Sequence, residues 1–271
     1  MYYSLFIVHY SFFIGKERKM YYFDTHAHYD DAAFDPDREQ LIKDMYDFGV
    51  KKIINVGADM QSSLNSIKFA EKYDFFYAAV GVHPYDAVKM CEEDVKMLQK
   101  YCKNYKFVAV GEIGLDYHYE DIDRDKQCYW FEKQLELAEI TGLPVIIHTR
   151  DADEQTYKII EKSGVRCGVI HAFSGSAELA QQYVKLGFYI GVGGVVTFKN
   201  AKKLVRVVEK VSLSRILLET DAPYLTPEPY RGKRNNSQNL QYVAAKIGEI
   251  KQIEPNEVIK ITCENAEKLF L

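Results

Sequence analysis

The sequence predicts an α/β protein folded as a (β/α)₈ TIM-like barrel, and three observations support this. Eight short β-rich runs recur along the chain, separated by longer amphipathic stretches that favour helices. This alternation is typical of a parallel sheet covered on both faces. Eight such repeats in about 250 residues match the size of a barrel. A doubly wound open sheet usually has a glycine-rich phosphate loop after its first strand, and the corresponding segment FDTHAHYD has none.

The expected strands alternate with expected helices from one end of the chain to the other. The strands are residues 21–26, 52–57, 75–83, 107–114, 144–149, 167–173, 188–194 and 215–221. A helix is expected over 123–142, because apolar residues recur there at helical spacing and Gly142 marks its end. A similar pattern predicts a helix within 176–187, and a closing helix begins near Pro255.

The chain of 271 residues contains no low-complexity linker, which predicts a single domain over residues 20–271. Residues 1–19 differ from the rest. Their apolar run is shorter than the roughly 20 residues of a membrane-spanning helix, and no basic segment precedes it, as one would in a signal peptide. We expect Met20 to be the functional start and residues 1–19 to be an extension outside the fold.

Composition excludes some classes of protein. The net charge of −4 argues against tight, sequence-independent nucleic-acid binding through a global basic field, so nucleic-acid chemistry would rest on a local site. The five cysteines are scattered and form no C-x-x-C motif, which favours a reduced, cytoplasmic chain. No membrane segment and no obligate protein partner are expected.

Polar residues of related chemistry follow five of the eight expected strands. They are His26 and His28 after the first strand, Glu112 after the fourth, His148 after the fifth, His171 after the sixth and Asp221 after the eighth. The carboxyl ends of barrel strands converge on one mouth, and histidine with carboxylate is a metal-ligand set. A single histidine after an apolar run is usually a core or rim residue, but six such residues together predict a metal site.

Two divalent ions are expected, because six protein ligands around one ion would leave no position for substrate or water. The ligands divide into His26, His28 and Asp221 for one ion, His148 and His171 for the other, and Glu112 as the bridge. Asp221 and Glu112 are the expected catalytic residues, with Asp221 orienting the attacking water and accepting its proton. The ligand types are compatible with Mg²⁺, Mn²⁺ or Zn²⁺ and do not choose between them.

Four further residues are candidates for substrate binding. His83 ends the third expected strand and would meet a substrate phosphate or a carboxylate that supports the metal ligands, with structural packing beside Pro84 as its alternative. Arg150 would do the same, unless it pairs with a neighbouring aspartate. Arg231 and Lys233 lie in YRGKRNN, just after the eighth strand. Beside a metal mouth this basic loop would supply counter-charge for a polyanion, whereas elsewhere it would be a solvated turn.

The motifs themselves resemble those of the TatD-related deoxyribonucleases, metal-dependent hydrolases of the amidohydrolase-like superfamily. They are, in order from about residue 20 to the C-terminus, FDTHAH, GVHPYD, GEIGLDYH, PVIIHTRDA, HAFSGS, GFYIGVGGVVTFKNA, LLETDAPYLTP and RGKRN. The resemblance implies 3′–5′ exonuclease or related endonuclease activity on DNA with divalent cations, and the family's metal ligands fall on the same six residues. Our leading hypothesis is cleavage of single-stranded or damaged DNA ends. One departure is Ser237, where many relatives carry proline, which is expected to loosen that loop.

Two other functions stay open. The same two-metal mouth would activate water against a carbonyl, as in an esterase, an amidase or a D-aminoacyl-tRNA deacylase, because fold does not fix substrate. A non-catalytic metal-binding scaffold would be expected to have lost ligands, whereas all six positions are filled. The basic loop favours a phosphate-bearing substrate but does not separate DNA from RNA.

Overall fold

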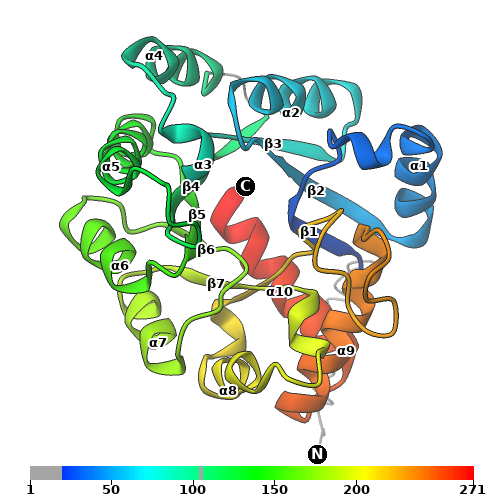
Figure 1. Ribbon diagram of the computed structural model, residues 1–271. Coiled ribbons are helices and arrows are strands. Elements are labelled where there is room, and N and C mark those ends of the chain that lie inside the picture. The colour runs from blue at the N-terminus through cyan, green and yellow to red at the C-terminus, as the bar shows by residue number, and fades with distance from the viewer. Residues whose placement is uncertain (1–19, 104–105) are drawn as a thin grey trace, which may run out of the picture.

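A computed structural model describes residues 20–103 and 106–271, and within them eight strands form one parallel sheet in chain order (Figure 1). The strands are β1 (Tyr22–Ala27), β2 (Val50–Val56), β3 (Phe76–Val80), β4 (Phe107–Asp116), β5 (Val145–Arg150), β6 (Gly168–Ile170), β7 (Tyr189–Val192) and β8 (Ile216–Leu218). Each expected run overlaps one strand, with ends that differ by a few residues, which confirms the predicted barrel. The extension expected at residues 1–19 lies outside the described residues.

Most helices form a ring around the sheet, and the C-terminal helix crosses the middle of that ring in the view of Figure 1. The helices are α1 (Arg38–Phe48), α2 (Met60–Lys72), α3 (Pro84–Ala87), α4 (Glu92–Tyr101), α5 (Arg124–Thr141), α6 (Asp153–Lys162), α7 (Ala177–Lys185), α8 (Lys202–Lys210), α9 (Leu240–Lys251) and α10 (Pro255–Phe270). Short 3₁₀ segments are η1 (Ala32–Phe34), η2 (Gly194–Thr197), η3 (Leu213–Arg215) and η4 (Ser237–Asn239). The helices predicted from sequence correspond to α5, α7 and α10. Gly142 ends α5 with a φ of 70°, a conformation that favours glycine.

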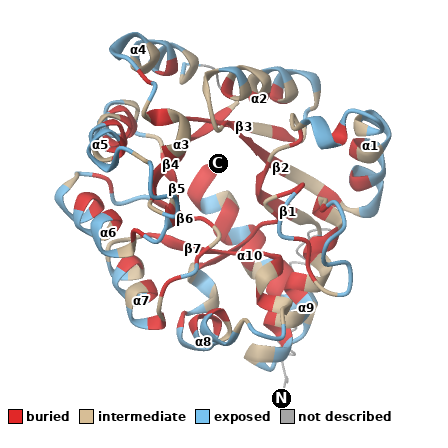
Figure 2. Cartoon of the chain, viewed as in Figure 1, coloured by how far each residue is buried: buried red, intermediate tan, exposed pale blue. Residues whose placement is uncertain are grey.

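The strands are almost entirely buried, as the burial colours of Figure 2 show, and the inner faces of the helices complete the core. All ten residues of β4 are buried, including Glu112 and Asp116. Full burial of a Val, Leu or Ile side chain stabilises the fold by about 1.5–3 kcal/mol. Removing a carboxylate from water is costly unless it finds partners, so the two acids must be held by other side chains of the barrel.

The barrel closes between β8 and β1 just beyond the last residues of β8. The Asp221 N–H donates to the His26 carbonyl (2.9 Å), and the His28 N–H donates to the Ala222 carbonyl (2.8 Å). Ala27 and Ala222 form a parallel bridge at the same place. The closure of the barrel therefore brings together three of the predicted metal ligands, which come from opposite ends of the sequence.

Ser237 anchors the segment after β8 instead of loosening it. Its buried hydroxyl donates to Asp24 Oδ2 (2.6 Å) and lies 2.8 Å from the Tyr29 hydroxyl. Thr220 also donates to Asp24 Oδ2 (2.6 Å). The sequence-based expectation of a looser loop is wrong, because the serine side chain supplies a hydrogen bond that proline lacks.

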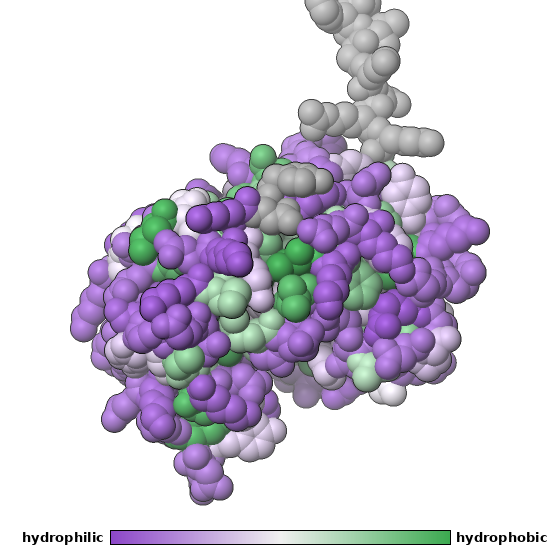
Figure 3. Space-filling view, turned by 90° about the horizontal axis from the view of Figure 1, so that it is seen from above, coloured by the Kyte–Doolittle hydropathy of each residue, from purple (hydrophilic) through white to green (hydrophobic). Residues whose placement is uncertain are grey.

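Hydrophilic residues cover most of the face shown in Figure 3, with hydrophobic residues in patches between them. Within the described part of the chain, no helix has the length and apolar character needed to cross a membrane.

Candidate metal centre

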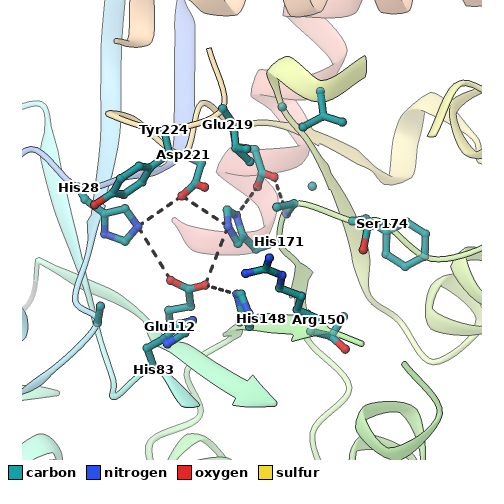
Figure 4. A pocket seen from close by; sticks show the side chains of 18 of the residues that line it. His28, His83, Glu112, His148, Arg150, His171, Ser174, Glu219, Asp221 and Tyr224 are labelled. Atoms are coloured by element: carbon teal, nitrogen blue, oxygen red, sulfur yellow. Dashed lines mark hydrogen bonds and ion pairs between the residues drawn. The ribbon is translucent and has the colours of Figure 1, made fainter. Parts of the chain in front are cut away.

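The six predicted ligands meet at the carboxyl ends of the strands (Figure 4). His26 lies on β1 and His28 directly after it, Glu112 lies on β4, His148 on β5, His171 directly after β6, and Asp221 three residues beyond β8. Five of them line a cavity of about 700 Å³, and the sixth, His26, is fully buried against them. The side chains come from distant parts of the chain and share one small volume.

Glu112 lies between two sets of histidines. Its Oε2 faces the Nε2 atoms of His26 (3.5 Å) and His28 (3.9 Å). Its Oε1 faces His148 Nδ1 (2.9 Å) and His171 Nε2 (3.9 Å). One carboxylate oxygen therefore points to each set, which is the arrangement that a bridging ligand needs.

Asp221 faces three of the same histidines from the other side. Its Oδ1 lies 3.4 Å from His28 Nε2, 3.6 Å from His171 Nε2 and 3.7 Å from His26 Nε2. Its backbone has a φ of 57°, the left-handed region, which aspartate tolerates better than most residues. The hydrogen bonds between β8 and β1 hold the Asp221 backbone in this strained conformation. The strain is therefore located at a residue whose carboxylate belongs to the cluster.

The candidate ligand atoms fall into three groups whose members all lie within 4.8 Å of one another. The groups are His26, Glu112 and His171; His26, His28 and Asp221; and His83, Asp116 and His148. The predicted ligand set for the first ion is thus one compact group. His171 is grouped with His26 and Glu112, whereas His148 is grouped with His83 and Asp116, so these two histidines do not form a separate group with each other.

The donor set fits divalent cations. Imidazole nitrogen and carboxylate oxygen both bind Zn²⁺ and related ions at about 2.0–2.2 Å, so two ligands of one ion lie roughly 3–3.7 Å apart. The Nε2 atoms of His26 and His28 are 3.1 Å apart, within that range. The rings of His26 and His171 stack with centroids 3.5 Å apart, which brings the second group of donors against the first.

Other groups orient three of the imidazole rings. The second nitrogen of His28, Nδ1, lies 2.9 Å from the Val56 carbonyl. His171 Nδ1 lies 3.1 Å from Glu219 Oε2, and His148 Nε2 lies 3.0 Å from Asp116 Oδ2. Such partners fix the ring orientation and the nitrogen that is left for a metal.

Glu219 and Asp116 contact the candidate ligands, and the sequence analysis did not select them. Both lie inside motifs already singled out, LLETD and GEIGLD, so an acidic residue near a predicted ligand was the available signal. Glu219 is buried and its Oε1 accepts from the Ala172 N–H (2.6 Å). Gly191 leaves space for it, since a Cβ at that position would lie 2.4 Å from Glu219 Oε2.

The charges of the cluster are strongly coupled. Burial alone lowers the pKa of His171, but the Glu219 and Asp221 carboxylates raise it to about 10. Burial alone would raise the pKa of Glu112, yet the neighbouring His26 and His148 hold it well below its usual range. The Glu112 carboxylate is therefore ionised. At the histidines, a proton and a metal ion would compete for the same imidazole lone pairs.

His83 and Arg150 both line the cavity. His83 caps the start of α3 by accepting from the Tyr85 N–H (3.3 Å), and its ring lies edge-on to His148 at 4.4 Å. Burial lowers the pKa of His83 to about 4, which keeps it neutral. Arg150 lines the cavity, and the aspartate that follows it, Asp151, pairs with His118 instead (3.0 Å).

The basic loop after β8 lies away from the cavity wall. The guanidinium of Arg231 lies over the Phe198 ring (4.2 Å) and the Lys233 ammonium near the Tyr230 ring (5.4 Å), and neither residue lines the cavity. The lysine that does line it is Lys203, at the start of α8. Nothing in the sequence around Lys203 distinguishes it from the adjacent Lys202.

Comparisons with known proteins agree with this architecture. The family model described as TatD related DNase matches residues 23–271. YabD of Bacillus subtilis, named an uncharacterized metal-dependent hydrolase, is 44% identical over 250 residues, which cover 92% of this chain and 98% of YabD. The crystal structure of YjjV, a TatD homologue from Escherichia coli, superposes with a TM-score of 0.87 at 34% identity, covering 92% of this chain and 97% of YjjV. With its fold, its cluster of metal-binding side chains and these relatives, the chain belongs to the TatD-related DNase family of metal-dependent hydrolases.

Proposed function

We propose that this protein is a deoxyribonuclease that hydrolyses phosphodiester bonds at DNA ends with two divalent ions. The observation that carries the proposal is the position of Glu112, whose two oxygens face different histidines while Asp221 faces three of them from the other side. His26, His28 and Asp221 would hold one ion, and His148 and His171 the other. Mg²⁺, Mn²⁺ or Zn²⁺ would each fit these ligands, and the bound ions would supply the Lewis acidity that hydrolysis by water needs.

The chain's own residues would divide the remaining work. Asp221 orients the attacking water and accepts its proton, a role that contributes about 10²- to 10⁴-fold in rate. Asp116 and Glu219 hold the rings of His148 and His171 in place. Neutral His83 and cationic Arg150 line the cavity, where they would contact phosphate oxygens. Arg231 and Lys233 stay candidates for contacts with a longer substrate outside the cavity.

The cavity and the charge of the chain both bear on the type of DNA. A volume of about 700 Å³ lies in the range of small-molecule sites, so it suits a terminal segment with unpaired bases. The net charge of −4 favours weak, distributive binding. The proposed substrates are therefore single-stranded or damaged ends.

One observation favours a second candidate, hydrolysis of an aminoacyl ester such as that of a D-aminoacyl-tRNA. Asp30, Asp31 and Asp59 line the cavity on the side of His28. Carboxylates beside a hydrolytic centre would suit the ammonium group of an aminoacyl ester. The same metal centre would then direct water to a carbonyl carbon.

Hydrolysis assays on DNA and on charged tRNA distinguish the two candidate functions. Metal-stripped protein is incubated with single-stranded DNA labelled at its 3′ end, with Mg²⁺, Mn²⁺ or Zn²⁺ added back and Asp221→Asn as the control. Metal-dependent release of nucleotides by the wild type alone supports the deoxyribonuclease. Absence of DNA cleavage with every metal, together with release of D-amino acid from charged tRNA, would replace it with the deacylase.

A further inference from the structure

Apart from Glu112, Asp221 and Glu219 in and beside the candidate metal centre, the acidic and basic residues that line the cavity lie on different sides of it. The acidic side consists of Asp30 and Asp31 from the segment after β1 and Asp59 from the segment after β2. The basic side consists of Arg150 at the end of β5 and Lys203 on α8. The candidate metal centre lies on the floor between them. A substrate bound at the metal centre therefore meets opposite electrostatic fields on its two flanks.

The three acidic groups are held by neutral donors. Asp31 Oδ2 accepts from the Tyr224 hydroxyl (2.8 Å), Asp30 Oδ1 accepts from the Asn55 amide (2.9 Å), and Asp59 Oδ1 accepts from the N–H of Ser62 (2.7 Å). These hydrogen bonds fix the positions of the three side chains. Three carboxylates on one side of the cavity disfavour a second phosphate there.

The basic side differs from the acidic side in the partners of its charged groups. Within residues 20–103 and 106–271, neither Arg150 nor Lys203 has a carboxylate within 4.0 Å. Figure 4 shows the Arg150 guanidinium beside His148, turned towards the cluster. The Lys203 charge also acts on the Asp153 carboxyl, where it offsets part of the rise in pKa that burial causes. Cations that line a cavity next to a hydrolytic centre without a carboxylate in direct contact are suited to an anion.

An apolar wall connects the basic side with the metal centre. Phe173, Val195 and Leu204 line the cavity between the strand ends and α8. Apolar and aromatic side chains of this kind accommodate a sugar and a base, while a few polar groups fix the orientation of the ligand. This arrangement of an apolar wall between the metal centre and the two cations matches a nucleoside. The nucleoside would carry one phosphate at the metal centre and a second phosphate near Arg150 and Lys203.

We propose that Arg150 and Lys203 form a subsite for the phosphate next to the scissile one, so that the nucleic-acid strand leaves the cavity over β5 and α8. This inference rests on the proposed function and specifies its substrate class: the end of a strand carrying a further phosphate on one side only. A phosphate on the opposite side would face Asp30, Asp31 and Asp59 and would not increase the affinity for the substrate. Lys203 is then a residue that determines specificity.

Three thymidine dinucleotides that share one scissile bond test the subsite. They are TpT, pTpT with a 5′-terminal phosphate and TpTp with a 3′-terminal phosphate, assayed with manganese-loaded enzyme. We expect kcat/KM to rise roughly tenfold for one of the two phosphorylated compounds relative to TpT, as a charge-assisted hydrogen bond would give. We expect Arg150→Met and Lys203→Met each to lower that ratio towards one.

Lys202→Met is the matched control, because Lys202 precedes Lys203 on the same helix and is equally exposed but does not line the cavity. It should keep the wild-type ratio. An equal gain for pTpT and TpTp, or a ratio that neither cavity variant changes, would overturn the subsite while leaving the deoxyribonuclease intact. If wild-type enzyme cleaves none of the three, the proposed function fails. The dissociation constants of the three compounds, measured by calorimetry, then decide the subsite, and equal values would overturn it.

Discussion

The mouth of the barrel and its opposite end are both rich in polar and aromatic residues, but the charged groups at the two ends have different kinds of partners. At the mouth, buried carboxylates face imidazoles, whose charge depends on a proton or a metal. At the opposite end, a second, more open cavity contains Lys51, Lys52 and Glu267. There Lys52 pairs with Glu267 (2.6 Å), and Lys51 lies 3.3 Å from the centre of the Tyr46 ring. The opposite end balances fixed charges within the protein, whereas the mouth holds donors that suit an added cation.

This difference indicates that the type of polar residue, more than its abundance, distinguishes a candidate active site from ordinary surface. Lysine and glutamate at neutral pH carry charges that cancel directly. Histidine with carboxylate leaves lone pairs available for a metal. Substitutions at the two ends should therefore affect different properties, catalysis and metal binding at the mouth and only stability at the opposite end.

The largest effect is expected for Asp221→Asn. Asparagine keeps the shape of the side chain but cannot accept the proton of the attacking water, so kcat should fall by about 10²- to 10⁴-fold. The measurement is the rate of nucleotide release from single-stranded DNA, with circular dichroism to verify folding. Glu267→Gln at the opposite end is the control and should keep wild-type activity. Equal losses in both variants would remove the distinction between the two ends.

Glu112→Gln should change metal stoichiometry. An amide is a poor bridge, so the variant should bind about one ion where the wild type binds two. Metal content after equilibrium dialysis, measured by mass spectrometry, gives the count. Two tightly held ions in the variant would show that Glu112 is not the bridge.

Asp116→Asn and Glu219→Gln should weaken metal binding less severely. Each removes a carboxylate that orients an imidazole, and such changes typically cost 10- to 100-fold in metal affinity or activity. Competition with a chromogenic chelator measures the affinity without any substrate. Unchanged affinity in both variants would mean that the rings of His148 and His171 keep their orientation without these contacts.

The smallest effect is expected for Lys52→Met at the opposite end. The side chains of Lys52 and Glu267 are both partly accessible to solvent, so the loss should be about 1 kcal/mol or less in the free energy of unfolding, with no change in activity. Urea denaturation provides the stability and the DNA assay the activity. A loss of several kcal/mol would mean that this end contains a buried ion pair of structural importance.

The barrel and the meeting point of the six predicted ligands could be predicted from sequence, because each of these residues ends or follows an apolar run and parallel strands converge at one edge. Their assignment to two ions stays a prediction. The orienting roles of Asp116 and Glu219 were not predictable, since which ring nitrogen faces which carboxylate depends on side-chain geometry. Lys203 was missed because only the packing of α8 brings it to the cavity. Arg231 in the YRGKRNN loop was predicted to face the substrate, but its guanidinium lies over the Phe198 ring, a contact that the sequence does not reveal.

The most direct test of the two-ion centre is an anomalous diffraction map from crystals soaked in Mn²⁺. We predict two peaks, one on each side of the Glu112 carboxylate and roughly 3.5–4 Å apart. The first peak should lie among His26, His28 and Asp221, and the second beside His148 and His171. A single peak, or a peak confined to the His83, Asp116 and His148 group, would contradict the proposed centre.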